Sequence, residues 1–119
     1  MDNISNVGLS ERMFYKLKEI TSDYFTQELD CYRFAISLSI YHKLPFKDRV
    51  LENRKNKYHV GSVDEDFIFR NSVREIFPSE NGEEYKAIEK LADVGVEYLD
   101  NYIKKKGYLD VDDIMKNEP

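Results

Sequence analysis

The stretch that decides the fold of this chain is residues 28–42, which read ELDCYRFAISLSIYH. Apolar residues occur on nearly every side of a helix built from this stretch, whereas a surface helix carries a single apolar stripe. We therefore predict a central helix that packs against neighbours on several sides. Pro45 ends it, because the residue before a proline, here Leu44, is pushed out of helical geometry.

A first helix is predicted before the central one, over residues 10–21. Ser10 is a good N-cap, since its hydroxyl accepts a hydrogen bond from a free amide of the first turn. Residues 23–27 are predicted to form a turn, and the alternation around Val7 and Leu9 predicts a very short strand. The apolar stripe of this helix consists of Met13, Leu17, Ile20 and Tyr24.

A third helix is predicted in the second half of the chain, after irregular residues 45–61. Ser62-Val63-Asp64-Glu65 has the form of a capping box, and the helix that it opens stops at Pro78. The residues expected to be buried on this helix are Phe67, Ile68, Val73, Ile76 and Phe77.

The longest helix is predicted over residues 83–106, with a short final turn at residues 110–115. Gly95 lies in its apolar stripe, where glycine costs about 1 kcal/mol relative to alanine, so we expect another helix to approach closely there. Residues 104–106 are lysines that suit the end of the helix dipole, and Gly107 provides a left-handed stop. The stripe consists of Tyr85, Ile88, Leu91, Ala92, Val96, Leu99 and Ile103.

The composition agrees with one small helical domain. Of the 119 residues, 41% are hydrophobic and 13% aromatic, which is enough to support a core. Three prolines and five glycines are too few for the turns of a β-sandwich or barrel. We predict a single compact all-α domain over residues 1–119, with four helices, a core at about residues 9–106 and a short C-terminal tail.

The expected location is the cytoplasm. No run of about 20 apolar residues occurs, so no membrane partner is expected. The first residues, Met1-Asp2-Asn3-Ile4, are acidic and polar, unlike a secretory signal. A lone Cys31 cannot form an internal disulfide.

Catalytic residues are not expected. His42 and His59 are best suited to acid–base chemistry at neutral pH, but neither lies in a recognisable motif. Cys31 lies on the central helix, where a free thiol usually acts as a small hydrophobic side chain. We predict no enzyme, no cofactor and no metal site. The helix dipole explains the acidic residues near helix starts, which are Asp64, Glu65, Asp66, Asp110, Asp112 and Asp113.

Charge is divided unevenly along the chain, whose net charge is −5. Residues 1–63 carry +2, residues 64–119 carry −7, and residues 43–57 carry +4. Two interpretations of this basic loop stay open: a directed contact surface for phosphates, and a solvated connection. Its six cations are Lys43, Lys47, Arg49, Arg54, Lys55 and Lys57.

The predicted order of short strand, helix, turn and helix resembles a ribbon-helix-helix unit. Residues 7–9, 10–21 and 28–42 carry this resemblance. Such units pair their strands into a ribbon that enters the major groove of DNA. This strand offers only Asn6 and Gly8 outward, so we expect no groove reading by it.

Three stretches also resemble the small DndE proteins of bacterial DNA phosphorothioation systems. Leu9-Ser10 with Leu17-Lys18 is similar to the family's opening helix, and residues 31–39, CYRFAISLS, to its central one. Tyr85-Lys86-Ala87-Ile88, through Leu91 and Gly95-Val96 to Tyr98-Leu99, is similar to its final helix. The resemblance implies a helical protein that oligomerises, takes a non-enzymatic part in DNA sulfur modification or phage defence, and binds duplex DNA, preferably nicked, through surface lysines.

Two functions from different classes are therefore expected. In the first, an auxiliary homo-oligomer binds duplex DNA, and the six cations of residues 43–57 neutralise phosphates without reading bases. In the second, the chain is an assembly subunit that binds other proteins of the modification system, with its aromatic helix faces building an oligomer and its acidic half docking a partner. Nine Tyr and seven Phe exceed what a small core needs, which predicts self-association in both cases.

Overall fold

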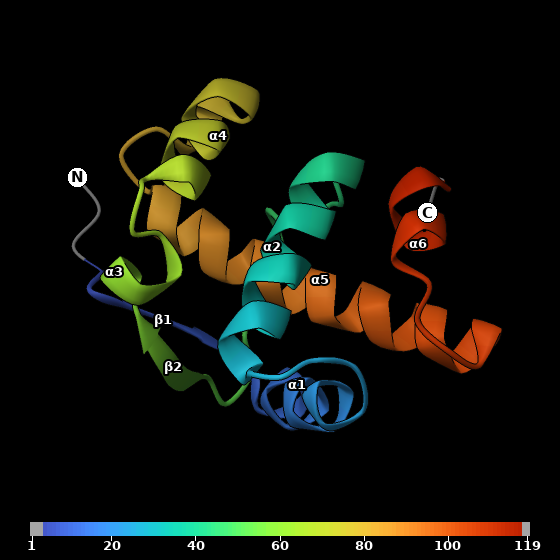
Figure 1. The fold of residues 1–119 in the computed structure, drawn as a ribbon. Helices are drawn as coiled ribbons and strands as arrows, with labels where there is room; N and C mark the ends of the chain where they lie inside the picture. The colour runs from blue at the N-terminus through green and yellow to red at the C-terminus, as the bar shows by residue number, and fades with distance from the viewer. Residues whose placement is uncertain (1–3, 118–119) are drawn as a thin grey trace.

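Helix α5 (Glu84–Lys106) is the axis of the molecule, and helices from both halves of the chain pack against it (Figure 1). The computed structural model describes residues 4–117. These residues are mainly helical, as predicted, but they form six α-helices, a 3-10 turn and a two-stranded sheet. In chain order the other elements are β1 (Asn6–Leu9), α1 (Glu11–Tyr24), α2 (Glu28–His42), β2 (Lys55–His59), α3 (Val60–Val63), α4 (Ile68–Ile76), the 3-10 turn (Pro78–Glu80) and, after α5, α6 (Val111–Lys116).

Helix α2 has the predicted bounds and crosses α5 between α4 and α6 (Figure 1). The predicted close approach at Gly95 is confirmed, because a Cβ placed there would lie 2.2 Å from the Ala35 carbonyl oxygen. At the same crossing, the Ser39 hydroxyl donates a 2.7 Å hydrogen bond to the Leu91 carbonyl. The two helices therefore meet backbone to backbone, which only a residue without a side chain permits at position 95.

Helix α1 begins as predicted, with the Ser10 hydroxyl accepting a hydrogen bond from the Met13 amide at 3.3 Å. Met13, Leu17 and Ile20 are buried against the core. The prediction was wrong for Tyr24, which is 38% exposed because it is the last residue of the helix and lies beyond the core.

The sheet corrects the prediction that residues 45–61 are irregular throughout. β2 pairs with β1 in antiparallel register, with Val7 opposite Tyr58 and Leu9 opposite Lys55. The sequence of β2 is KNKYH, so no alternation of apolar residues marks it as a strand. Its polar side chains are held by tertiary contacts instead; the Lys57 ammonium, for example, lies 4.6 Å from the centroid of the Phe14 ring.

The outer edge of β1 is closed by groups of the same chain. The Gly8 amide donates to Glu89 Oε1 at 2.9 Å, and the Gly8 carbonyl accepts from the Tyr32 hydroxyl at 2.9 Å. The Ser10 amide donates to Asp93 Oδ1 at 2.8 Å. A strand of another molecule can add to a sheet only where the edge strand has unpaired backbone N–H and C=O groups. The order strand, helix, helix is present, but β2 on one side and side chains of α2 and α5 on the other take up both edges of the strand that a ribbon-helix-helix dimer would share.

The predicted third helix is divided, and its predicted capping box is wrong. Ser62 lies inside α3, and it is the Asp64 carboxylate that caps α4, by accepting the amides of Phe69 and Arg70 at 2.8 and 3.0 Å. This later start buries Phe69 and the predicted Val73, and leaves Phe77 only partly buried. The residues wrongly predicted to be buried are Phe67, Ile68 and Ile76, which are 47%, 57% and 38% exposed.

The C-terminal part follows the prediction closely. Gly107 ends α5 in the left-handed region, at φ 93°. Lys104 and Lys106 pair with Asp100 and Asp113 at 2.9 and 3.4 Å, which supports a structural role for the lysine run. The short final turn is helix α6. Among the described residues, none of the helices is both long enough and apolar enough to span a bilayer.

Candidate functional site

Four of the six cations predicted to contact DNA are paired with carboxylates of the same chain. The pairs are Arg49 with Asp93 (2.9 Å) and Glu97 (2.7 Å), Arg54 with Glu89 (2.7 Å), Lys55 with Glu11 (3.4 Å), and Lys57 with Glu28. The side chains of Arg49 and Lys57 are only 23% and 13% exposed. Carboxylates of the same chain therefore neutralise most of the positive charge of the basic segment, residues 43–57.

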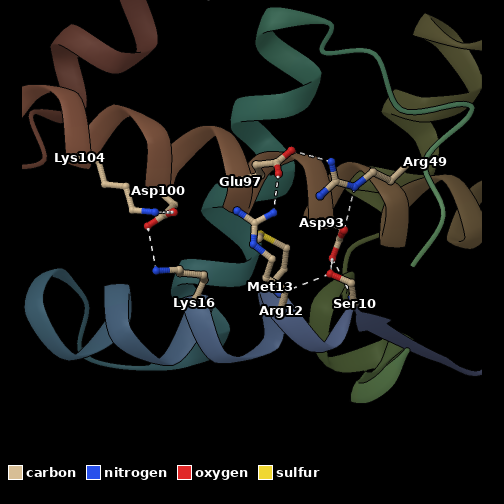
Figure 2. Close-up of polar contacts among 9 residues, drawn as sticks. All are labelled: Ser10, Arg12, Met13, Lys16, Arg49, Asp93, Glu97, Asp100 and Lys104. Carbon is tan, nitrogen blue, oxygen red and sulfur yellow. Dashed lines mark hydrogen bonds and ion pairs between the residues drawn. The ribbon is translucent and has the colours of Figure 1, made fainter. Parts of the chain in front are cut away.

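A row of carboxylates along α5 receives two of these cations, Arg49 and Arg54. Figure 2 shows the part of the row that binds Arg49. Its centre is Asp93, which is fully buried and accepts three hydrogen bonds: from the Ser10 amide at 2.8 Å, the Ser10 hydroxyl at 2.9 Å and Arg49 Nε at 2.9 Å. Burial alone would lower the pKa of Arg49, but its hydrogen bonds to Glu97 and Asp93 raise that pKa overall. The row thus fastens the start of α1 and the basic segment to α5. Its members are Glu89, Asp93, Glu97 and Asp100.

A sequence signal for this row exists, although the sequence prediction missed it. Glu89, Asp93, Glu97 and Asp100 follow one another at four-, four- and three-residue steps, which places them on one face of a helix. A face of acids beside a buried stripe indicates that cations from elsewhere in the chain pack onto it. The partners themselves follow only from the tertiary structure.

The two remaining cations of the basic segment, Lys43 and Lys47, form no ion pair within residues 4–117. Both line a shallow pocket of about 430 Å³, which we call the lysine-rimmed pocket. The Lys47 ammonium donates to the Ser79 hydroxyl at 3.0 Å, so it lies near the end of α4. The other residues that line the pocket are Leu44, Pro45, Phe46, Asp48, Arg49 and Phe77.

A second exposed feature is the turn that leads into α4, which we call the α4 tip and define as residues 65–68. All four of its residues, Glu65-Asp66-Phe67-Ile68, are exposed. Phe67 adopts a left-handed backbone conformation, with φ 58°, which is unfavourable for a bulky side chain. The Arg70 guanidinium lies 4.3 Å from the centroid of its ring.

The α4 tip is held in place by Asp64, the buried residue that precedes it. Asp64 is 3% exposed, and besides capping α4 it accepts a 3.1 Å hydrogen bond from the Tyr85 hydroxyl of α5. Burial, and then the neighbouring Asp64 carboxylate, raise the pKa of Tyr85 to about 12, so its hydroxyl stays a donor. The strained, exposed Phe67 is therefore presented on a fixed support and not on a loose loop.

A second contact between α4 and α5, in which Arg74 donates a hydrogen bond to Glu84, predicts an acid-sensitive contribution to the free energy of unfolding. Burial alone would raise the pKa of Glu84, but hydrogen bonds from the Gly82 amide (2.7 Å) and Arg74 (3.1 Å) outweigh it, so the pKa lies below its usual 4.5. A lowered folded-state pKa adds stability above the unfolded value, and this stability is lost as the pH falls through the folded value. We expect Glu84→Gln to lose less stability than wild type between about pH 6 and about pH 3, measured by urea unfolding.

The matched control is Glu83→Gln, because the Glu83 side chain is 60% exposed and precedes Glu84 directly. This control should unfold with the acid sensitivity of the wild type. An unchanged acid sensitivity in Glu84→Gln would show that the Arg74 contact does not hold α4 in solution.

The residues considered for acid–base chemistry are engaged in local structure. His42 Nε2 lies 2.8 Å from the Ile114 carbonyl oxygen, and His59 Nδ1 accepts the Gly61 amide at 3.0 Å. Burial raises the pKa of the Cys31 thiol to about 12. Asp110 caps α6 by accepting the Asp113 amide at 3.1 Å. Within residues 4–117, no three His, Cys, Asp or Glu side chains are grouped as a metal site would require.

A larger pocket, of about 570 Å³, lies at the start of α1. Its charged walls are largely the pairs already described, since Arg49, Asp93 and Glu97 all line it. Arg12 also lines it and is bonded to Glu97 at 3.3 Å. The pocket therefore offers few unpaired groups to a ligand.

Comparison with known proteins adds no relative: no family model, no curated protein and no solved structure matches this chain. The resemblance to DndE proteins stays a prediction.

Proposed function

We propose that this chain is a non-enzymatic protein-interaction subunit and that the α4 tip is its binding surface. The observation that carries the proposal is the pair Phe67 and Ile68, two consecutive large apolar side chains that are 47% and 57% exposed on a rigid turn. Aromatic residues and arginine dominate the binding energy of protein interfaces, and Arg70 stacks on Phe67 here. Backbone strain such as that at Phe67 is concentrated at functional sites.

The same geometry disfavours the alternative of DNA binding through the basic segment. Affinity for a duplex rises with the number of phosphates that a protein neutralises. Arg49, Arg54, Lys55 and Lys57 would have to leave their carboxylates first, and those carboxylates would then repel the duplex. On the DndE resemblance, we propose that the partners are proteins of a DNA sulfur-modification or defence apparatus, in which another component binds the DNA.

A gel-shift experiment tests this choice of class. We expect no retardation of intact or nicked duplex at low salt, because within residues 4–117 only Lys43 and Lys47 of the six cations lack a carboxylate partner. Retardation that weakens with salt and disappears when Arg54, Lys55 and Lys57 become alanine would restore the DNA-binding function. Circular dichroism of the triple variant must first show that it remains folded.

Affinity purification of the tagged chain from its own host tests the tip. We expect Phe67→Ser/Ile68→Ser to reduce at least about tenfold the amount of the protein that co-purifies in stoichiometric yield with the wild type. Tyr108→Ser is the matched control, since Tyr108 is an equally exposed aromatic residue (52%) far along the chain, and it should leave recovery unchanged. Equal recovery with the wild type and the double variant would refute the tip as the binding surface.

A further inference from the structure

We infer that the α4 tip of one molecule binds the lysine-rimmed pocket of a second copy, so that the chain assembles head to tail. This inference rests on the proposed function, because it assumes that the tip binds protein, and it names the partner of that surface.

The tip supplies an acidic and apolar ligand. Glu65 and Asp66 are exposed and form no ion pair within the described part of the chain. Phe67 and Ile68 follow them directly and are about half exposed. A surface that fits this segment needs an apolar floor and positive charge at its rim.

The lysine-rimmed pocket has both properties. Leu44, Phe46 and Phe77 supply apolar lining, and the rings of Phe46 and Phe77 pack edge to face at 5.0 Å. Lys43 and Lys47 are the lining cations without a carboxylate partner among the described residues, whereas Arg49 is neutralised by Asp93 and Glu97. Asp48 is the one acid among the lining residues, and the Lys90 ammonium lies 3.1 Å from the Lys47 carbonyl and adds positive charge. The volume of about 430 Å³ is that of an ordinary binding pocket.

The position of the two surfaces excludes an intramolecular contact and favours a head-to-tail one. The tip lies at the start of α4 and includes its first residue, Ile68, whereas Phe77 directly follows the last, so the two surfaces lie at opposite ends of a helix of nine residues, about 13 Å long. A symmetric contact between two tips would place Glu65 and Asp66 of both copies together and would be repulsive. A head-to-tail contact, in which each copy gives its tip to one neighbour and its pocket to another, leaves a free tip and a free pocket at the two ends, and it closes into a ring or extends.

Exchange of charge between the two surfaces tests the inference. The variants are Lys43→Glu/Lys47→Glu and Glu65→Lys/Asp66→Lys, all at exposed positions, so both are expected to fold. We expect the wild type to exceed the monomer mass by light scattering at tens of micromolar, and each variant alone to associate at least about 100-fold more weakly. An equimolar mixture should regain assembly, because each variant then meets a surface of opposite charge. Lys105→Glu/Lys116→Glu, exposed residues elsewhere, should assemble like the wild type.

Three results would overturn the inference: a monomeric wild type, assembly that survives in either variant alone, or a mixture that stays monomeric. In each case, the proposed function would still hold, with another partner, if a different protein co-purifies with the wild type but not with Phe67→Ser/Ile68→Ser. If no co-purifying protein depends on Phe67 and Ile68, both the inference and the proposed function are wrong.

Discussion

An Asp93→Ala variant is expected to lose about 3–5 kcal/mol of unfolding free energy. Asp93 is fully buried, so its removal leaves Arg49 Nε and both donors of Ser10 without their acceptor. The loss reaches across the molecule, because these contacts join the basic segment and the start of α1 to α5 (Figure 2). Urea unfolding measures it directly.

Glu97→Ala is the matched control for Asp93→Ala. Glu97 binds the same arginine, but its side chain is 32% exposed, so water replaces much of what is lost. We expect a loss of less than about 1 kcal/mol. A similarly small loss in Asp93→Ala would contradict the central position that we give to this carboxylate, and would leave the cations of the basic segment weakly held and available to phosphates.

A Gly95→Ala variant is expected to be destabilised by about 3 kcal/mol, although the same change in an open helix stabilises by about 1 kcal/mol. The added methyl group would lie 2.2 Å from the Ala35 carbonyl oxygen and 2.7 Å from the Ser39 hydroxyl. Two helix backbones would have to separate, and the Ser39–Leu91 hydrogen bond would break. The sign of the change, measured by thermal or urea unfolding, decides whether α2 and α5 are this close.

Asn101→Ala serves as the control for helix propensity, since Asn101 is exposed on the same helix. It should gain at most about 0.7 kcal/mol. If Gly95→Ala gains stability in the same way, the close crossing of α2 and α5 does not exist in solution.

The helices were predictable where one local signal was sufficient. The bounds of α2 followed from an apolar run that Pro45 ends, and the close crossing at Gly95 followed from a glycine inside a buried stripe. β2 was not predictable in this way, because its side chains are polar and its pairing partner lies more than 40 residues away. The start of α4 was misplaced because Ser62 and Asp64 both suit a cap, and only packing on Tyr85 selects Asp64.

The charged residues of the candidate site were predictable from the sequence, but their ion pairing was not. The six cations of residues 43–57 are a correct observation on the sequence, yet four of them are neutralised by carboxylates between 29 and 48 residues away. The α4 tip was missed because Phe67 and Ile68 are apolar residues of the kind found in a core. The cap at Asp64 turns them outward.

The most direct test of the account places a photo-crosslinking p-benzoylphenylalanine at position 67, in place of Phe67, in the protein's own host. An aromatic ring is retained there, and its exposure allows it to reach whatever covers the tip. We predict one dominant crosslinked protein, absent when the same probe replaces Tyr108, with this chain itself as the product if assembly is head to tail. Crosslinks to nucleic acid, or a pattern identical to that from position 108, would contradict the claim that the α4 tip is a protein-binding surface.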